Sequence, residues 1–370
     1  MNRKKHFLFL SIVVCLNIIV LLLIIIFIAE FIFILGKRYN VKYFNEYELS
    51  GMVYDRDYGW RIKKNLKTEI YYTNDKGFRD INRKFAKGKN VKRIIFLGDS
   101  YTFGASFKDN EIFTGIFNVK VKNHFNDTCC FDVMNISAPA WSTDQQYIYL
   151  KKEGIHYKPD YVFLMIAPND IRETYAKKIF LVDDSERLIR VSEFIVPGID
   201  RYLWHLSNVS YLFNFLQENI LKTSFGTFKQ VFKYFPLTLY VEGHEVWDFP
   251  LFLKNDNQEV IKAKKLFETL LIEMNNICTS NNCKFIAVII PTKIEFTGKL
   301  NKDKYMPGKI ANFINDIADR NNIHFIDLFR CLQEEPYPLK IYQSDDYHFS
   351  AYGHKWVANK IFEDFVYKKK

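Results

Sequence analysis

Short apolar runs alternate with longer amphipathic segments along most of the chain after residue 92. The short runs are rich in Ile, Val, Leu and Phe and end at polar or turn-forming residues, a pattern typical of strands buried on both faces of a parallel sheet. We predict strands at residues 93–97, 131–136, 161–166, 285–290 and 324–328. We predict helices at residues 111–125, 143–152, 258–280, 309–321 and 351–365. Alternating strands and helices indicate βαβ units, and therefore an α/β fold: a three-layer α/β/α sandwich around a parallel sheet.

This alternation is lost between residues 176 and 255. Aromatic clusters there, such as Tyr202 with Trp204 and Tyr234 with Phe235, are separated by turn-forming residues. An insertion of about 80 residues after the third strand would lie at the carboxyl edge of the sheet, where loops carry binding sites. We therefore predict a lid or substrate-binding subdomain at residues 176–255.

A long apolar run occupies residues 7–35. It is dense in Ile, Leu, Val and Phe and is interrupted only by Ser11, Asn17 and Glu30. About 20 such residues cross a bilayer, so the run is long enough to form a transmembrane helix with some tilt. A cleaved signal peptide would have an apolar core of about 7–15 residues and a small-residue cleavage site, and no such site follows this run. The run therefore predicts a membrane anchor.

The chain accordingly divides into an N-terminal tail and anchor at residues 1–36, an extension at residues 37–92, and the α/β domain at residues 93–370. The extension is rich in Tyr, Lys and Asn, and apolar residues such as Trp60 and Phe78 would anchor it to the first strand. Basic residues flank the apolar run on both sides, so charge does not predict the orientation in the membrane.

The composition narrows the range of partners and cofactors. The chain has 370 residues and a net charge of +10, but its lysines are scattered and it has no zinc-finger or RNA-binding signature, so we predict no nucleic-acid partner. None of the six cysteines has metal-ligand spacing with a histidine, and we predict no metal site. Cys278 and Cys283 are close enough in sequence for a disulfide, and two buried thiols are the alternative.

A serine follows the first predicted strand of the α/β domain. The strand ends at Gly98, which permits a tight turn, and Asp99 and Ser100 are residue types that begin helices. Ser100 would therefore lie at the carboxyl edge of the sheet and at a helix N-terminus, where backbone N–H groups and the helix dipole stabilise a developing oxyanion. Ser100 is the candidate nucleophile, and its alternative role is a helix cap.

Three further sites reach the same edge of the predicted sheet. A turn at residues 138–141 follows the second strand, and Asn169 follows the third. Near the C-terminus, Asp345 and His348 are three residues apart, just before the last predicted helix. A histidine at this position can accept the serine proton, and an aspartate can orient its other ring nitrogen. The order of these residues predicts a triad of serine, histidine and aspartate.

This pattern resembles the SGNH family of GDSL-type hydrolases, whose blocks carry a Gly-Asp-Ser turn, a glycine, an asparagine and a closing Asp-x-x-His. The matching residues are Gly98-Asp99-Ser100, Asn169-Asp170, Asp345 and His348. The closest likeness is to membrane-anchored bacterial members, which carry stretches similar to residues 72–80 and 142–146. It extends over most of the chain after residue 59 and implies the SGNH-hydrolase, flavodoxin-like version of the predicted sandwich.

The resemblance also implies an oxyanion hole. Its donors would be the backbone N–H of Ser100, the backbone N–H of Ala140 and the side-chain amide of Asn169. The residues in supporting positions would be Gly98, Asp99 and Asp170. Ala140 stands where the family has glycine. Alanine also carries an N–H, but a positive φ at this position would strain it.

A serine acyl-ester hydrolase or O-acetyltransferase without a cofactor is the activity that the resemblance implies. Water or a sugar hydroxyl could accept the acyl group, and the sequence does not separate these reactions. Resemblance to alginate-type O-acetyltransferases favours an acetylated envelope or exported glycan as substrate. It also favours export or acetylation machinery as partner and a catalytic domain outside the cytoplasm. The alternatives are a lysophospholipase-like lipid esterase and an inactive glycan-binding scaffold of an export complex.

Overall fold

The computed structural model of the chain describes residues 3–39, 51–125, 130–192, 202, 205–206, 208–216, 249–344 and 346–367. The chain divides into two compact units: Met1–Tyr54 with Val196–Tyr234, and Asp55–Ile195 with Phe235–Lys370. The predicted catalytic residue Asp345 and much of the predicted insertion at 176–255 lie outside the described residues.

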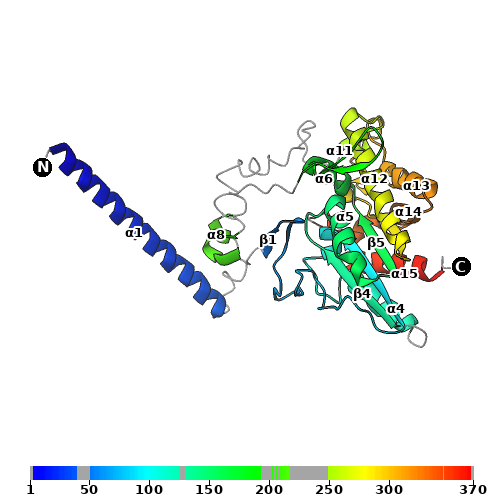
Figure 1. Cartoon of the computed structure of the whole chain (residues 1–370), viewed down its shortest axis with the longest axis horizontal. Helices are drawn as coiled ribbons and strands as arrows, with labels where there is room; N and C mark the ends of the chain where they lie inside the picture. Colours follow the sequence, from blue (N-terminus) through cyan, green and yellow to red (C-terminus); the bar gives the residue numbers. More distant parts are fainter. Residues whose placement is uncertain are drawn as a thin grey trace. The chain divides into compact units, whose positions relative to one another are not determined.

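The first unit contains a long apolar helix, α1 (Arg3–Arg38), and a short helix, α8 (Tyr211–Leu216) (Figure 1). The stretch Phe9–Arg38 is long and apolar enough to cross a membrane, so it fits a single-pass anchor or a signal segment. Within this unit, the Glu30 carboxylate accepts hydrogen bonds from the backbone N–H groups of Tyr211 and Leu212, at 2.9 and 3.0 Å. Glu30 thereby satisfies N–H groups that have no partner inside α8.

The second unit is built on a five-stranded parallel sheet. Its strands are β3 (Val91–Gly98), β4 (Cys130–Ser137), β5 (Tyr161–Ile166), β8 (Lys284–Ile289) and β9 (His324–Asp327). They pair in the order β4-β3-β5-β8-β9, and every pairing is parallel. The chain order reverses at β3 and β5, which makes the carboxyl ends of these two strands the switch point where ligands bind in such sheets.

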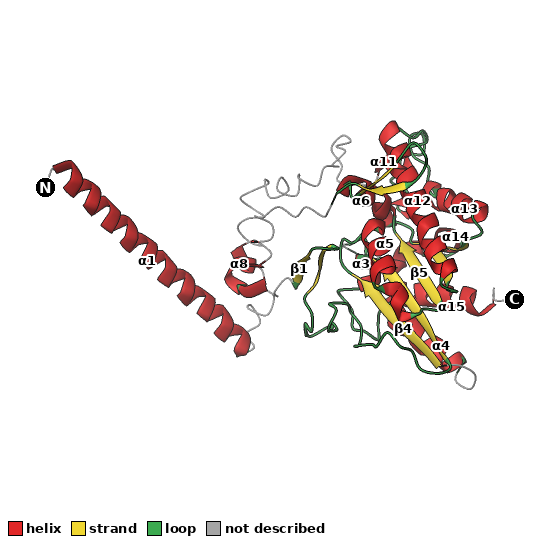
Figure 2. Cartoon of the chain, viewed as in Figure 1, coloured by secondary structure: helices red, strands yellow, loops and turns green. Residues whose placement is uncertain are grey.

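Helices cover both faces of this sheet, as predicted (Figure 2). One layer holds α4 (Phe113–His124) and α15 (Ala351–Tyr367), which pack against each other. The other layer holds α5 (Thr143–Lys152), α6 (Pro168–Lys177), α12 (Gln258–Ser280) and α13 (Lys309–Arg320). The fold is therefore the predicted α/β sandwich.

The surroundings of strand β3 explain why its sequence is continuously apolar. Ile94 and Phe96 belong to the core cluster beneath α4 and α15, and the rings of Phe96 and Phe163 stack with centroids 4.7 Å apart. Ile95 and Leu97 alternate with them and are also fully buried, on the opposite face. A strand covered on both faces needs apolar side chains at every position.

Each predicted strand and helix of the α/β domain is present, and its ends differ from the prediction by at most two residues. The last strand ends at Asp327 rather than 328, because the Asp327 carboxylate accepts the Arg330 N–H at 3.0 Å and begins α14 (Leu328–Gln333). Further short strands and α-helices include β1 (Met52–Asp55), β2 (Gly59–Ile62), α3 (Ser100–Phe103), β6 (Phe180–Val182), β7 (Leu188–Arg190) and α11 (Phe249–Phe252).

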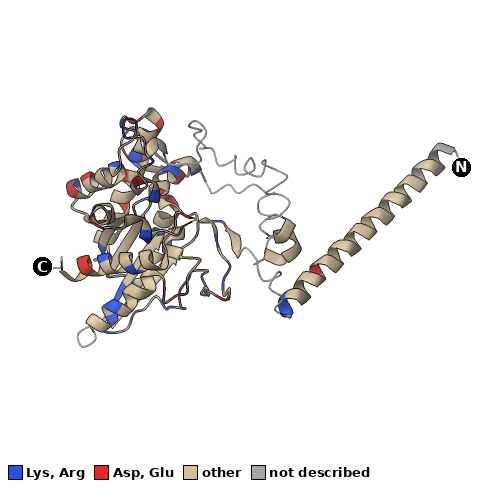
Figure 3. Ribbon diagram, turned by 180° about the vertical axis from the view of Figure 1, so that it is seen from behind, with Lys and Arg blue, Asp and Glu red and all other residues tan. Residues whose placement is uncertain are grey.

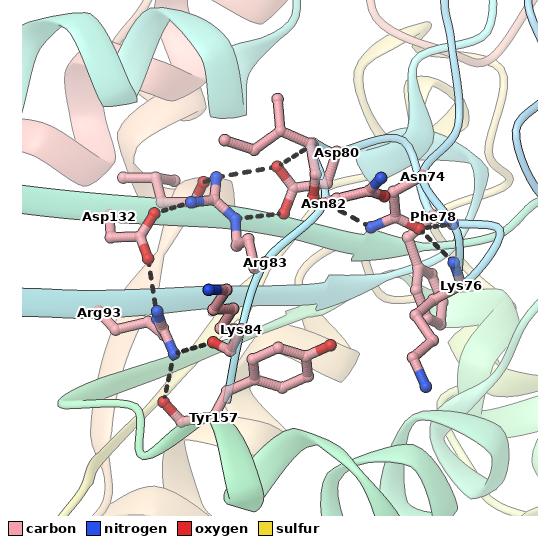
Figure 4. A network of polar contacts seen from close by, with 12 residues as sticks. Asn74, Lys76, Phe78, Asp80, Asn82, Arg83, Lys84, Arg93, Asp132 and Tyr157 are labelled. Atoms are coloured by element: carbon pink, nitrogen blue, oxygen red, sulfur yellow. Dashed lines mark hydrogen bonds and ion pairs between the residues drawn. The ribbon is translucent and has the colours of Figure 1, made fainter. Parts of the chain in front are cut away.

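A chain of ion pairs fastens the extension to the sheet (Figure 4). Arg83 contacts Asp80 at 2.9 Å and also pairs with Asp132 in β4. Asp132 in turn accepts a hydrogen bond of 2.8 Å from Arg93 in β3, and Arg93 donates to the Tyr157 carbonyl at 2.8 Å. The extension therefore has a fixed attachment to the two strands that precede Ser100 and the turn at 138–141.

Lysine and arginine are interspersed with acidic residues over the α/β domain, as the scattered lysines of the sequence predict (Figure 3).

The sequence left two alternatives for Cys278 and Cys283, a disulfide or two buried thiols. In the structure both residues are buried free thiols. The hydrogen bond between them and their burial raise the pKa of Cys278.

Candidate active site

The turn after β3 presents Ser100 as the sequence predicts. Ser100 is the first residue of α3, and the Asp99 carboxylate caps this helix by accepting the Tyr101 N–H at 2.9 Å. Gly98 is required here because an added Cβ would lie 2.0 Å from the Thr102 hydroxyl oxygen. The turn thus holds a serine hydroxyl at the carboxyl edge of the sheet.

His348 meets this serine from the opposite end of the chain. Its Nε2 lies 2.8 Å from Ser100 Oγ, and its Nδ1 lies 2.7 Å from a carboxylate oxygen of Asp346. The Asp-x-x-His spacing predicts Asp345 for this carboxylate, and because Asp345 lies outside the described residues, that assignment stays a prediction. Asp346 is the acidic residue that the structure places against the imidazole.

The protonation of this pair follows from its surroundings. Burial by itself would raise the pKa of Asp346, but the hydrogen bond and the charge of His348 outweigh burial, so the pKa is lower than usual. Asp346 is therefore ionised at neutral pH and favours a proton on Nδ1 of His348. Nε2 is then free to accept the Ser100 proton.

A lysine that the sequence analysis missed supports the loop that carries His348. Lys293 Nζ donates to the backbone carbonyls of Gln343, Ser344 and Asp346, at 2.6, 2.8 and 3.1 Å. Lys293 comes just after β8, at the same edge of the sheet. In the sequence, only its position just after a strand indicates a role for Lys293. Its partners are backbone carbonyls, which every residue has, so they leave no pattern of residue types.

Asn169 lies next to the serine turn, as predicted. It is the second residue of α6, and its side-chain amide donates to an Asp99 carboxylate oxygen at 3.3 Å. The N-cap residue of α6 is Ala167, and the carboxylate of Asp170, three residues later, accepts its N–H at 2.8 Å. Burial raises the pKa of Asp99 and of Asp170, and the charge of Asp99 raises that of Asp170 further. The Asn169 amide carries two hydrogens, and the bond to Asp99 uses one of them.

The turn at 138–141 also lies at this edge, because β4 ends beside Gly98 in the sheet. The Trp141 N–H donates to the Ala138 carbonyl at 3.1 Å, which closes a turn with Pro139 and Ala140 at its centre. Ala140 has φ of 61°, so it occupies the left-handed region that favours glycine. Among the residues that the structure describes, none accepts a hydrogen bond from the Ala140 N–H.

Two side chains donate hydrogen bonds to backbone carbonyls of this turn. Trp60 Nε1 donates to the Pro139 carbonyl at 3.0 Å, and Lys177 Nζ donates to the Ala140 carbonyl at 3.3 Å. Lys177 also lies over the Trp60 ring, 5.0 Å from its centroid. From the sequence, Trp60 is predicted only as an apolar anchor, and Lys177 is not among the predicted site residues.

The stretch at residues 72–80 is tied to the nucleophile helix through Arg79. Its buried guanidinium donates to the carbonyls of Phe103 and Gly104, at 2.8 and 2.6 Å, and pairs with Asp109 at 2.6 Å. Carbonyls at the end of a helix lack partners within it, so Arg79 caps α3 at its C-terminus. The stretch therefore positions Ser100 without contacting it.

The geometry suits nucleophilic catalysis by serine. A hydroxyl, a histidine base, an ionised carboxylate and candidate oxyanion donors converge at one edge of the sheet. In the described part of the chain, no group of three His, Cys, Asp or Glu side chains is arranged to hold a metal ion.

Comparison with known proteins gives both a sequence match and structural likenesses. Residues 237–361 match the family described as GDSL-like Lipase/Acylhydrolase. A lipase/acylhydrolase from Enterococcus faecalis is similar in structure, with 14% identity, a TM-score of 0.41, and 74% of this chain and 95% of that chain covered. A catalytic mutant of an acetylxylan esterase from Geobacillus stearothermophilus has 15% identity, a TM-score of 0.40, and 74% and 94% covered. No curated protein matches the chain in sequence.

The segment that matches the family contains only part of the site. The matched segment contains β8, β9 and His348, and Ser100 lies before it. The histidine of this matched segment reaches the serine of the Gly98-Asp99-Ser100 turn across a parallel α/β sheet, which is the arrangement that the resemblance to GDSL-type hydrolases implies.

Proposed function

We propose that this protein is a serine-dependent acyl-ester hydrolase or acyltransferase that works through Ser100 and His348. The observation that carries the proposal is the 2.8 Å approach of His348 Nε2 to Ser100 Oγ, with Asp346 on the other ring nitrogen. A serine hydroxyl is a weak nucleophile by itself, and an adjacent histidine base activates it. Asp345, from the Asp-x-x-His spacing, is the alternative orienting carboxylate.

The reaction follows from these contacts. Ser100 Oγ attacks the ester carbonyl while its proton passes to His348 Nε2, and the tetrahedral intermediate carries a negative oxygen. The Ser100 N–H, the Ala140 N–H and the Asn169 amide are the proposed donors to this oxygen. His348 then returns the proton to the departing alcohol, which leaves an acyl group on Ser100. A second hydroxyl, activated by His348, attacks this acyl group and frees the serine.

The second hydroxyl decides the reaction class. Water gives an esterase, and a sugar hydroxyl gives an O-acetyltransferase. We propose an acetylated envelope or exported glycan as substrate, supported by the apolar N-terminal helix, which would tether the enzyme at a membrane, and by the resemblance to alginate-type enzymes. Export or acetylation machinery is the proposed partner. Higher activity on long-chain than on acetyl p-nitrophenyl esters would favour a lipid esterase instead.

Covalent labelling with a fluorophosphonate tests the proposal. We expect the wild-type chain to be labelled, the Ser100→Ala variant to remain unlabelled and the His348→Ala variant to react slowly. Absence of labelling in correctly folded wild-type protein would overturn the proposal and favour the inactive glycan-binding scaffold. Hydrolysis of p-nitrophenyl acetate by the same three proteins then gives the catalytic rates.

The orientation of the α/β domain is a separate proposal. We propose that the N-terminus is cytoplasmic and that the chain beyond about residue 37 lies outside, because the glycan-modifying proteins that it resembles work there. A cysteine at exposed Lys302, in a background with Cys129 and Cys130 replaced by serine, would react with an impermeant maleimide on intact cells. Labelling only after lysis would contradict this orientation.

A further inference from the structure

We propose that Trp60 is a positioning residue that holds the Pro139–Ala140 peptide with its N–H available to the oxyanion. The proposal rests on the proposed function and deepens it, since it explains how an oxyanion hole works with alanine where the family has glycine. The hydrogen bond of 3.0 Å from Trp60 Nε1 to the Pro139 carbonyl carries it.

The peptide geometry links the two groups. The Pro139 carbonyl and the Ala140 N–H belong to one peptide unit, and none of the described peptides is cis. In a trans peptide the carbonyl and the N–H point in opposite directions. A side chain that holds the carbonyl on one side therefore directs the N–H to the other. Ala140 is exposed, and no described residue takes its N–H, so that hydrogen is open to a ligand.

Alanine makes this restraint necessary. Ala140 has φ of 61°, a conformation that glycine adopts freely and alanine disfavours. Rotation of the Pro139–Ala140 peptide by half a turn would bring φ of Ala140 to a negative value, which alanine prefers. The same rotation would put the Pro139 carbonyl oxygen where the N–H had been. A carbonyl oxygen repels an oxyanion, so the rotated turn would be inactive.

Trp60 is itself held in place. The residue is 4% exposed, and its backbone carbonyl accepts a hydrogen bond of 2.8 Å from Trp141 Nε1. Lys177 lies over its ring and donates to the Ala140 carbonyl at 3.3 Å, which fixes the next peptide as well. The two peptides that meet at Ala140 are thus both held, and a change at Trp60 releases the one that carries the N–H.

The decisive variant removes the indole N–H and keeps an aromatic ring. In full-length protein, Trp60→Phe should lower kcat for p-nitrophenyl acetate by about 10- to 10²-fold, below the 10²–10³-fold cost of losing an oxyanion donor outright, with little change in KM. Replacement of Trp60 by β-(3-benzothienyl)alanine, which has the shape of tryptophan without its N–H, should give the same loss. This second variant keeps the test valid if phenylalanine leaves a void.

A matched control comes from the same extension. Tyr58→Phe also removes one partly buried hydrogen bond, from the Tyr58 hydroxyl to Glu153 at 2.8 Å, but none to the turn. Its kcat should stay within about 2-fold of wild type. An equal loss of kcat in Tyr58→Phe and Trp60→Phe would mean that any weakening of the extension damages the site, which would overturn the specific role of Trp60.

Rescue by glycine separates positioning from general damage. Glycine at 140 has no preference for the rotated peptide, so the Trp60→Phe, Ala140→Gly double variant should recover to within about 3-fold of Ala140→Gly alone. Full activity of Trp60→Phe, or a double variant as impaired as Trp60→Phe, would overturn this inference while fluorophosphonate labelling of Ser100 upholds the proposed function. If folded wild-type protein is unreactive to fluorophosphonate, both fail together.

Discussion

His348 Nε2 lies 2.8 Å from Ser100 Oγ, although the two residues are 248 positions apart in the chain. Ser100 follows the second strand from one edge of the sheet, and His348 lies on the loop before the last helix, where Lys293 holds the backbone through three carbonyls. The distance between His348 Nε2 and Ser100 Oγ therefore depends on the packing of two loops that are far apart in the sequence.

The first prediction concerns the carboxylate that orients His348. Asp346→Asn should lower kcat on p-nitrophenyl acetate by roughly 10²-fold, because an asparagine favours the wrong tautomer and does not stabilise the imidazolium. KM should change little. Steady-state kinetics on the two asparagine variants, Asp346→Asn and Asp345→Asn, measure the effect. A larger loss in Asp345→Asn would support the sequence-based assignment and contradict the role of Asp346.

Variants of Asn169 show whether this residue is an oxyanion donor or a structural residue. Asn169→Ala should lower kcat by about 10²–10³-fold with little change in melting temperature, since the side chain that bonds the N-cap N–H of α6 is that of Asp170 and not of Asn169. Asn169→Asp keeps the size of the side chain but places a negative charge near the developing oxyanion and near Asp99. We expect it to be folded and inactive. A folded and fully active Asn169→Asp would exclude the oxyanion role.

Buried Asp170 should make stability depend on pH. Burial and the charge of Asp99 raise its pKa in the folded state, so its contribution to stability is complete below the unfolded pKa of about 3.9 and is lost as pH rises through the folded pKa. Asp170→Asn removes this titration and can still accept the Ala167 N–H. The wild type should therefore lose stability relative to Asp170→Asn as the pH rises above about 4. Denaturant unfolding across this range measures the difference, and a constant difference would contradict the assignment.

Ala140→Gly should raise the stability of the fold. Removing the Cβ relieves about 1–2 kcal/mol of strain at positive φ, and the greater freedom of glycine in the unfolded chain offsets about 0.5–1 kcal/mol. The net gain of about 0.5–1 kcal/mol should appear as a higher melting temperature. Ala311→Gly, within helix α13, is the control and should lose about 1 kcal/mol. A loss of stability in Ala140→Gly would mean that the turn is not strained.

The hydrophobic pattern of the sequence determined the sheet and its layers. Strands such as β3 are buried on both faces, so every position had to be apolar, and this periodicity is readable without any contact. The positions of Ser100 and Asn169 followed as well, because residues after consecutive parallel strands reach one edge of the sheet. The Gly98 turn and the Asp99 cap depend on local chemistry, which a short stretch of sequence contains.

Tertiary structure alone decided which groups hold the site in shape. Trp60 reaches Pro139, Arg79 reaches Phe103 and Gly104, and Lys293 reaches the loop before His348, in each case through backbone carbonyls. Every residue has a carbonyl, so such partners leave no pattern in the sequence. The contact of Asp346 with His348 likewise depends on the path of the loop, since neighbouring aspartates are equivalent by spacing. Periodicity reports that a residue is buried, and only the folded chain determines which atom it meets.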